Sequence, residues 1–290
     1  MMIFVSGTKR SGTSMWMQVL RAAGLPVLGE AFPTAFVGAL KAANPDGFYE
    51  SLLRNGIYFA TNPHPVTGRY FLPEHVAGYA VKVFIPGVIR SERAYIGHLI
   101  ANLRPWQEYE ASITRLYAIE DAARNAGIPA PEARATMPPV YEWWLENFSL
   151  VRDITLRRYP ARLLSYAQVL ADPEATIADI LKWIGRGDLT TALTAVKPEH
   201  RTQDRPVSTT TLAPDDARVF DDLYAAVADR TIFTSNTLLK QLSACNQRLL
   251  PELTQLQTRA LQAEIEHNQT HKGPPPAAVA GLPNKLDGFD

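Results

Sequence analysis

The chain has 290 residues, of which 46% are hydrophobic, and its 29 Lys and Arg residues balance its 29 Asp and Glu residues. This length and composition are typical of a globular protein of one or two domains, and zero net charge disfavours broad nucleic-acid binding, which needs a basic surface. A single cysteine, Cys245, excludes an internal disulfide. The apolar N-terminal segment is too short for a secretion signal and no run of about 18 apolar residues occurs, so we expect no membrane span and a cytoplasmic protein.

The first half of the chain predicts strands that alternate with helices. An apolar run at residues 2–6 precedes a glycine-containing loop and indicates a buried parallel strand. Residues 12–23 then follow a helical pattern that ends at a glycine. Further buried strands are predicted at residues 79–85 and 97–103, and a helix at residues 106–126.

A proline-containing loop at residues 128–139 precedes a second group of elements. Residues 140–159 predict a helix, and residues 161–166, ARLLSY, predict a strand. Residues 171–185 predict another helix, because a proline stands near the start and a glycine at the end. The alternation predicts an α/β fold of three layers, in which a central parallel sheet carries helices on both faces.

The C-terminal third predicts a helical extension of this fold. Between residues 236 and 265, a seam of residues recurs at alternating spacings of three and four: Leu239, Leu242, Asn246, Leu249, Leu253, Leu256, Ala260 and Ala263. Pro251 interrupts this seam and predicts a kink or a restart of the helix. The pattern fits a helix packed on its own domain and a coiled coil that forms a homo-oligomer through residues 236–265 equally well. We therefore expect one domain at 1–235, a helical extension at 236–267 and a disordered tail at 268–290.

Residues 4–16, FVSGTKRSGTSMW, predict an anion-binding loop between the first strand and the first helix. Such a loop offers backbone N–H groups and the positive end of the helix dipole. Cationic and hydroxyl side chains gather there, namely Lys9, Arg10, Ser11, Thr13 and Ser14. The pattern is close to the P-loop G-x-x-x-x-G-K-[ST], but Thr13 replaces the lysine after Gly12, and no strand ends in an Asp suited to Mg²⁺. We therefore expect a phosphate-like ligand without a metal, and disfavour ATP hydrolysis.

The loop resembles the 5′-phosphosulfate loop of sulfotransferases that use 3′-phosphoadenosine-5′-phosphosulfate (PAPS) as donor. KRSGTS is similar to the R-S-G-T-S form of the bacterial branch of that family. The family's second signature is a strand followed by an Arg and, eight residues later, a Ser, which both hold the 3′-phosphate; Arg104 and Ser112 match it. Arginine offers a forked donor to a phosphate, and Ser112 would lie about two turns into a helix beginning beside Arg104.

Three further segments resemble the bacterial branch. NPDGFYES at residues 44–51 is similar to its N-P-x-G-[FY]-[WY]-E element. Residues 163–185 resemble its Tyr-containing strand and D-P helix, which implies that Tyr166 lies against the adenine. Residues 196–207 resemble its basic loop over the nucleotide, which implies a contact from Arg201. The resemblance implies that PAPS, and its product 3′-phosphoadenosine 5′-phosphate (PAP), are held by ten residues: Lys9, Arg10, Ser11, Gly12, Thr13, Ser14, Arg104, Ser112, Tyr166 and Arg201.

The resemblance covers about residues 2–207 and implies transfer of a sulfuryl group to a hydroxyl of a small-molecule or carbohydrate acceptor. Sulfuryl transfer, like phosphoryl transfer, needs mainly positioning and charge stabilisation, and no metal is required. Arg10 stands where the family has its catalytic lysine, so it is expected to neutralise the leaving oxygen.

The resemblance leaves two candidates for the general base. Lys82 matches a strand lysine of the cytosolic enzymes, but Phe84 stands where those enzymes have their catalytic histidine. The base is therefore expected at Glu50 or Glu30, which both follow the first helix. Glu50 is favoured, because its two aromatic neighbours in the sequence could desolvate it and raise its pKa.

Several alternatives stay open at this point. Trp143, Trp144, Phe148 and the loop at 128–139 either line the acceptor pocket or belong to the core. A P-loop kinase of small molecules would use the same loop, but it needs Mg²⁺ and the lysine that Thr13 displaces. A non-catalytic module that assembles through its C-terminal helix is the third interpretation.

Overall fold

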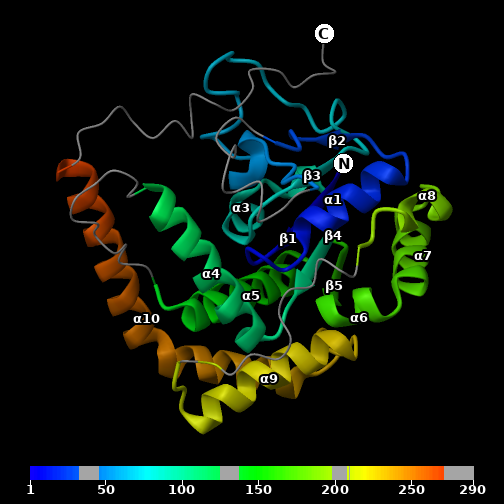
Figure 1. The fold of residues 1–290 in the computed structure, drawn as a ribbon. Helices are drawn as coiled ribbons and strands as arrows, with labels where there is room; N and C mark the ends of the chain where they lie inside the picture. Colours follow the sequence, from blue (N-terminus) through cyan, green and yellow to red (C-terminus); the bar gives the residue numbers. More distant parts are fainter. Residues whose placement is uncertain (33–45, 125–136, 198–207, 209, 271–290) are drawn as a thin grey trace.

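The fold was examined in a computed structural model that describes residues 1–32, 46–124, 137–197, 208 and 210–270 (Figure 1). Its centre is an all-parallel sheet in the order β2-β3-β1-β4-β5, formed by β1 (Met2–Gly7), β2 (Val27–Leu28), β3 (Ala80–Lys82), β4 (Ile96–Leu103) and β5 (Ala161–Ser165). The predicted α/β class with a parallel sheet is confirmed. Gly7 is in register with Asn102, and Leu103 with Ser165, so the carboxyl ends of three strands meet at one edge of the sheet.

Helices cover both faces of the sheet, as a three-layer arrangement requires. The side chains of β1 divide between two cores, with Ile3 and Val5 in one and Met2 and Phe4 in the other. The first core is completed by α1 (Thr13–Ala22), α6 (Tyr166–Ala171), α7 (Pro173–Ile184) and α8 (Leu189–Leu193). The second core is completed by α3 (Ile85–Arg90), α4 (Trp106–Arg124), α5 (Pro139–Arg157), α9 (Pro214–Ala228) and α10 (Asn236–Thr270). The other described elements are two short 3-10 helices, η2 (Leu52–Asn55) and η3 (Arg93–Tyr95).

The predicted strand at 79–85 is wrong in its second half. The strand β3 ends at Lys82, and Ile85 begins the helix α3, with a proline in the first turn. Proline fits the first turn of a helix because its missing N–H has no helical partner there. A short apolar run does not separate a buried strand from a buried helix, which is why the sequence pattern failed here.

The first part of α10 packs on its own chain. Leu242, Cys245, Leu249 and Leu253 are buried in the core that α5 and α9 share. This packing favours the intramolecular interpretation of the leucine seam up to Leu253. The seam's later members are more accessible, and Leu261 beside them is 58% exposed.

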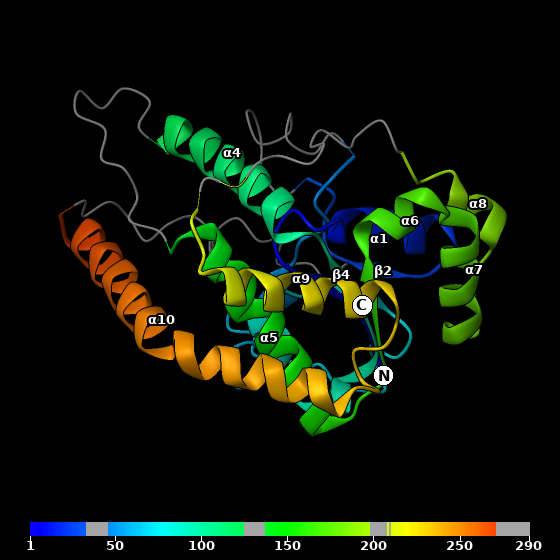
Figure 2. The ribbon, with the colours of Figure 1, turned by 90° about the horizontal axis from the view of Figure 1, so that it is seen from below.

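Of the two outcomes predicted at Pro251, a kink or a restart of the helix, the restart is wrong. The helix α10 runs through Pro251 to Thr270, and the ring of Pro251 is exposed to solvent. Figures 1 and 2 show that the helix axis changes direction along its length. The first three residues of the predicted tail at 268–290 belong to α10, and the others lie outside the described residues.

Trp143 and Trp144 belong to the core. Both are fully buried, and their rings stack on Phe220 of α9 at centroid distances of 5.6 and 4.4 Å. Phe148 is half-buried and stacks on Trp144. Of the two interpretations left open for these tryptophans, the core is therefore confirmed, and the loop at 128–139 lies largely outside the described residues.

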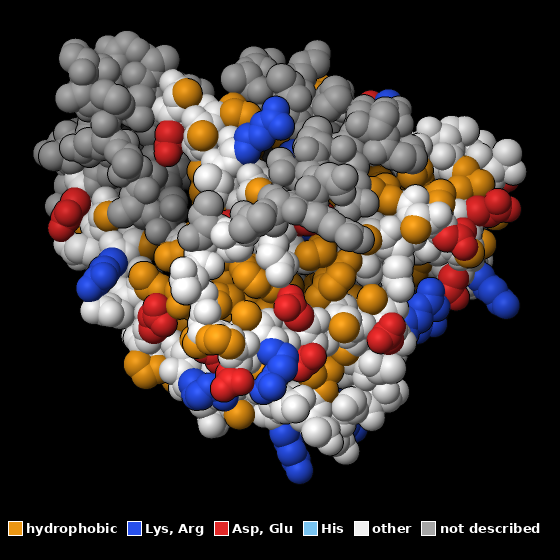
Figure 3. Space-filling model, turned by 60° about the horizontal axis from the view of Figure 1, so that its bottom comes forward, with side chains coloured by type: hydrophobic (Ala, Val, Ile, Leu, Met, Phe, Trp, Pro, Cys, Tyr) orange, Lys and Arg blue, Asp and Glu red, His pale blue; other side chains and the backbone are white. Residues whose placement is uncertain are grey.

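The surface carries charges of both signs, as the balanced composition predicts. On the face in Figure 3, acidic and basic side chains are interspersed around hydrophobic ones. Within the part of the chain that the structure describes, no helix is both long and apolar enough to cross a membrane.

Candidate anion-binding site

The loop between β1 and α1 is shaped by two glycines. Gly12 is the N-cap of α1 with φ of 92°, and a Cβ there would lie 2.7 Å from the ring of Tyr166 and 3.1 Å from Nδ2 of Asn102. A Cβ on Gly7 would lie 2.5 Å from the carbonyl oxygen of Asn102. Ser11 closes the turn, because its Oγ donates to the carbonyl of Thr8 at 2.6 Å. The loop can therefore hold this shape only with glycine at both places.

The structure places Arg104 and Ser112 beside this loop. Nη1 of Arg104 donates to the carbonyl of Arg10 at 3.2 Å, and Nε of Arg10 lies 3.4 Å from Oγ of Ser112. Both Arg104 and Ser112 are buried. Nε of Arg104 also donates to Oε2 of Glu108 at 3.0 Å. Arg10 of the loop and two polar residues about a hundred positions further along the chain thus converge where β1 and β4 end.

This convergence concentrates positive charge. Burial lowers the pKa of Arg10, and the nearby charges of Arg104 and Arg115 lower it further. Arginine stays protonated in proteins, so cations held this close favour an anion between them. The sequence pattern missed Arg115, although its place three residues after Ser112, on the same side of α4, is a usable signal.

Tyr166 completes this side of the site. It begins α6 directly after β5, and its ring centroid lies 5.1 Å from Cζ of Arg104. The ring is packed against Gly12 and is half-buried, so part of it is open to a ligand. Trp16 lies elsewhere: it is buried, and its Nε1 donates to Oδ1 of Asn102 at 2.8 Å, which makes it a core residue under the loop.

A second group of charges touches the loop through Ser14. Nζ of Lys82 lies 3.0 Å from Oε1 of Glu50 and 3.3 Å from Oγ of Ser14, and Glu50 also accepts from Arg54 at 2.6 Å. Glu50 and Lys82 are both buried. Arg54 was missed by the sequence analysis, although it stands four residues after Glu50. Glu30 pairs with Glu50 through backbone hydrogen bonds of 3.2 Å, while its side chain is exposed.

The expected rise in the pKa of Glu50 is wrong. Burial by itself would raise the pKa of this carboxyl, but the charges and hydrogen bonds of Lys82 and Arg54 outweigh it. The pKa of Glu50 therefore lies below its usual value. The pKa of Lys82 is also lowered, because burial and the charges of Arg54 and Arg10 outweigh the attraction of Glu50. Glu50 is thus an ion-paired carboxylate at neutral pH.

The remaining predicted residues are Lys9 and Arg201. Lys9 is exposed, and its Nζ lies 5.6 Å from the ring centroid of Tyr117. Arg201 lies outside the described residues. Both flanks of its segment are attached near the site: Lys197 pairs with Asp46 at 2.5 Å, and the hydroxyls of Ser208 and Thr210 donate to Glu110.

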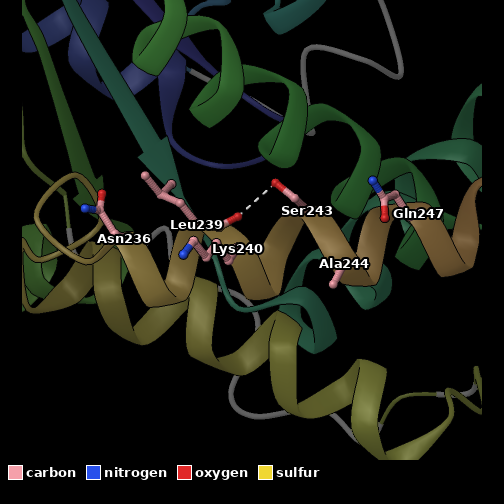
Figure 4. Close-up of a pocket in the computed structure, with 6 residues that line it drawn as sticks. All are labelled: Asn236, Leu239, Lys240, Ser243, Ala244 and Gln247. Atoms are coloured by element: carbon pink, nitrogen blue, oxygen red, sulfur yellow. Dashed lines mark hydrogen bonds between the residues drawn. The ribbon is translucent and has the colours of Figure 1, made fainter.

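An open hollow of about 470 Å³ lies elsewhere, along one face of α10 (Figure 4). Its described lining comes from that helix alone: Asn236, Leu239, Lys240, Ser243, Ala244 and Gln247. It contains none of the residues that converge at the loop. Its one drawn hydrogen bond is the ordinary helical contact from Ser243 Oγ to the carbonyl of Leu239, so we do not assign chemistry to it.

No family model matches the chain, and no curated protein matches it. Among the residues that the structure describes, no three His, Cys, Asp or Glu side chains are grouped as a metal site would need. The chemistry of the site therefore has to be inferred from its own residues.

Proposed function

We propose that this chain is a sulfotransferase with a P-loop-like α/β fold, which moves a sulfuryl group from PAPS to a hydroxyl of a small-molecule or carbohydrate acceptor. The observation that carries the proposal is the contact between Arg10 and Ser112, 3.4 Å, beside the bond from Arg104 to the carbonyl of Arg10. It joins a glycine loop to a second, buried cation. A nucleotide with phosphate groups at both its 5′ and 3′ positions needs two such places side by side.

The residues present fit such a donor. Loop N–H groups and the hydroxyls of Thr13 and Ser14, at the start of α1, suit the 5′-phosphosulfate. Arg104 and Ser112 suit the 3′-phosphate, and the partly exposed ring of Tyr166 suits the adenine. Nδ2 of Asn102 is buried without a partner among the described residues, and it points at Gly12. A buried donor that is left unused beside the loop is consistent with binding an anion.

Arg10 is suited to stabilise the charge that develops on the leaving oxygen. It lies at the junction of loop and helix with φ of 66°, where the helix dipole adds positive potential. PAPS would supply the transferable sulfuryl group and a leaving group already stable as an anion. The chain's part is then to hold cations in place, which needs no metal.

Glu50 is suited to position Lys82. Both of its carboxylate oxygens are engaged, one by Lys82 and one by Arg54, and its pKa is lowered. A carboxylate with these contacts is a weak base. Glu50 holds Lys82 next to Ser14. Ser14 directly follows Thr13, the residue that replaces the P-loop lysine.

Calorimetry tests the proposal directly. PAP, AMP and ATP are titrated into the protein, each with and without Mg²⁺. We expect PAP to bind without Mg²⁺ and at least about tenfold more tightly than AMP, since one phosphate bound by a buried arginine contributes about 1.5–3 kcal/mol. A preference for ATP with Mg²⁺ would instead support a kinase, and no binding of any of the three would support a non-catalytic module.

A further inference from the structure

A second group of ionisable side chains lies between α4 and α5, beside Lys9 of the loop. It consists of Tyr109 and Tyr117 on α4 and Glu142 and Glu146 on α5, and we call it the α4–α5 cluster. The hydroxyl of Tyr117 donates to Oε2 of Glu142 at 2.8 Å. Glu142 and Glu146 are one helical turn apart, so their carboxyl groups share one face of α5.

The cluster has hydrogen-bonding capacity that the described chain does not use. Glu146 is half-buried and makes no hydrogen bond or ion pair among the described residues. The hydroxyl of Tyr109 is fully buried beside the Glu142 carboxylate, and it makes no other hydrogen bond in the described part of the chain. Carboxyl groups that are largely removed from water are nearly always paired, so the unpaired carboxyl of Glu146 points to a ligand.

The cluster holds a proton near neutral pH. Burial raises the pKa of Glu146 to about 8, the neighbouring charge of Glu142 acts in the same direction, and Lys9 opposes them. Burial and the two carboxylates also raise the pKa values of Tyr109 and Tyr117, so both tyrosines stay neutral. A carboxylate with a pKa near the working pH is a far better proton acceptor than Glu50.

The cluster lies next to the loop along α4. Arg10 contacts Ser112, whereas Lys9 contacts Tyr117, five residues further along the same helix. At 1.5 Å per residue, the two contacts are roughly 7–8 Å apart along the helix axis. One loop cation thus faces the donor site and the next faces the cluster, so the two sites adjoin each other along α4.

We propose that the α4–α5 cluster binds the acceptor, that this acceptor is an uncharged polyhydroxyl compound, and that Glu146 takes the proton of its attacking hydroxyl; this inference rests on the proposed function. The acceptor oxygen forms a bond to sulfur while the bond from sulfur to the bridging phosphate oxygen breaks. The proton passes to the Glu146 carboxylate and later to solvent, and PAP leaves with the bonding electrons. The carboxylate of Glu142 repels an anionic acceptor, whereas both carboxyl groups and the tyrosine hydroxyls can bond to neutral hydroxyls.

The experiment follows PAP formation from PAPS with glucose or glucuronate as acceptor, a neutral and an anionic form of one ring. We expect glucose to exceed the rate in water alone and to exceed glucuronate. Glu146→Gln should lower kcat about 100-fold or more and abolish a rise in rate between about pH 7 and 9, while PAP affinity stays within about twofold. The matched control is Glu174→Gln, an exposed carboxyl at the start of α7, which should behave as wild type.

Glu146→Gln removes a half-buried carboxyl without a partner, so thermal stability should not fall, and a loss of rate cannot be ascribed to unfolding. The inference is overturned if glucuronate equals or exceeds glucose, if neither sugar exceeds water, or if Glu146→Gln keeps full activity. In each case the donor assignment still stands, provided that PAP binds without Mg²⁺ and in an Arg104-dependent manner.

Discussion

Replacement of Arg104 by alanine tests the site at its most buried cation. Arg104 is 5% exposed and donates to Glu108 and to the carbonyl of Arg10. Truncating one partner of a buried charged pair costs about 2–5 kcal/mol of binding, because the other charge is left behind. Here the remaining charge is the carboxylate of Glu108, beside the place assigned to the 3′-phosphate. A loss of about 3 kcal/mol corresponds to an increase of roughly 150-fold in the Kd for PAP.

The assay compares PAP with AMP by calorimetry, since AMP lacks the 3′-phosphate. The AMP affinity of Arg104→Ala should change less than about threefold. The double variant Arg104→Ala/Glu108→Gln also removes the negative charge that Arg104 had balanced, so it should recover about tenfold in PAP affinity and also restore thermal stability. Equal weakening of PAP and AMP would refute the assignment of Arg104 to the 3′-phosphate.

Three further predictions concern the loop, the buried ion pair and α10. Arg10→Ala should lower kcat at least about 100-fold while PAP still binds, Arg10→Lys should keep part of the activity, and EDTA should have no effect; unchanged turnover in Arg10→Ala would contradict the proposed role. Glu50→Gln removes the negative charge that balances the buried Lys82, so urea titration at pH 7 should show a loss of about 3–5 kcal/mol of unfolding free energy. The folded-state pKa of Glu50 is lowered, so its contribution to the unfolding free energy is present above its unfolded pKa and is lost as pH falls through the folded pKa. The difference in unfolding free energy between wild type and Glu50→Gln should therefore shrink in acid. A difference that stays constant with pH would be evidence against the ion pair. Leu242→Ala should cost about 2–5 kcal/mol, while Leu261→Ala, at an exposed position of the same helix, should cost less than about 0.5 kcal/mol; equal costs would show that the first part of α10 is not packed.

The sequence predicted those parts of the fold whose signal is local. An apolar run, a glycine loop and a helical pattern define β1, the loop and α1 without reference to any other segment. By contrast, the packing of α10 could not be predicted, because its seam fits any apolar surface. The surface that the α10 seam contacts is formed by α5 and α9. Folding brings residues such as Phe220 into that surface from a distant part of the sequence. The same holds for Trp143 and Trp144, since helical aromatic residues show no preference for core or pocket in sequence.

The candidate site was predictable where spacing follows a strand end. Arg104 and Ser112 follow β4, and parallel strands bring their carboxyl ends to one edge, so the approach to the loop could be foreseen. The lowered pKa of Glu50 could not, because Lys82 reaches it from another strand. Glu146 was missed for a similar reason: its environment is made by Tyr109, by Glu142 and by a loop lysine more than a hundred residues away.

The indole Nε1 of Trp143 donates to the carbonyl of Arg104 at 2.9 Å, and the same ring stacks on Phe220. The backbone of Arg104, which we assign to the 3′-phosphate, is therefore attached to the hydrophobic layer that contains Phe220 of α9. Any ligand that fixes Arg104 must, by thermodynamic reciprocity, also tighten the packing of that layer. The affinity for the proposed nucleotide would then depend on the packing of the core. A substitution at Phe220, which lies in that core, would weaken nucleotide binding, and the bound nucleotide would slow hydrogen exchange in α9.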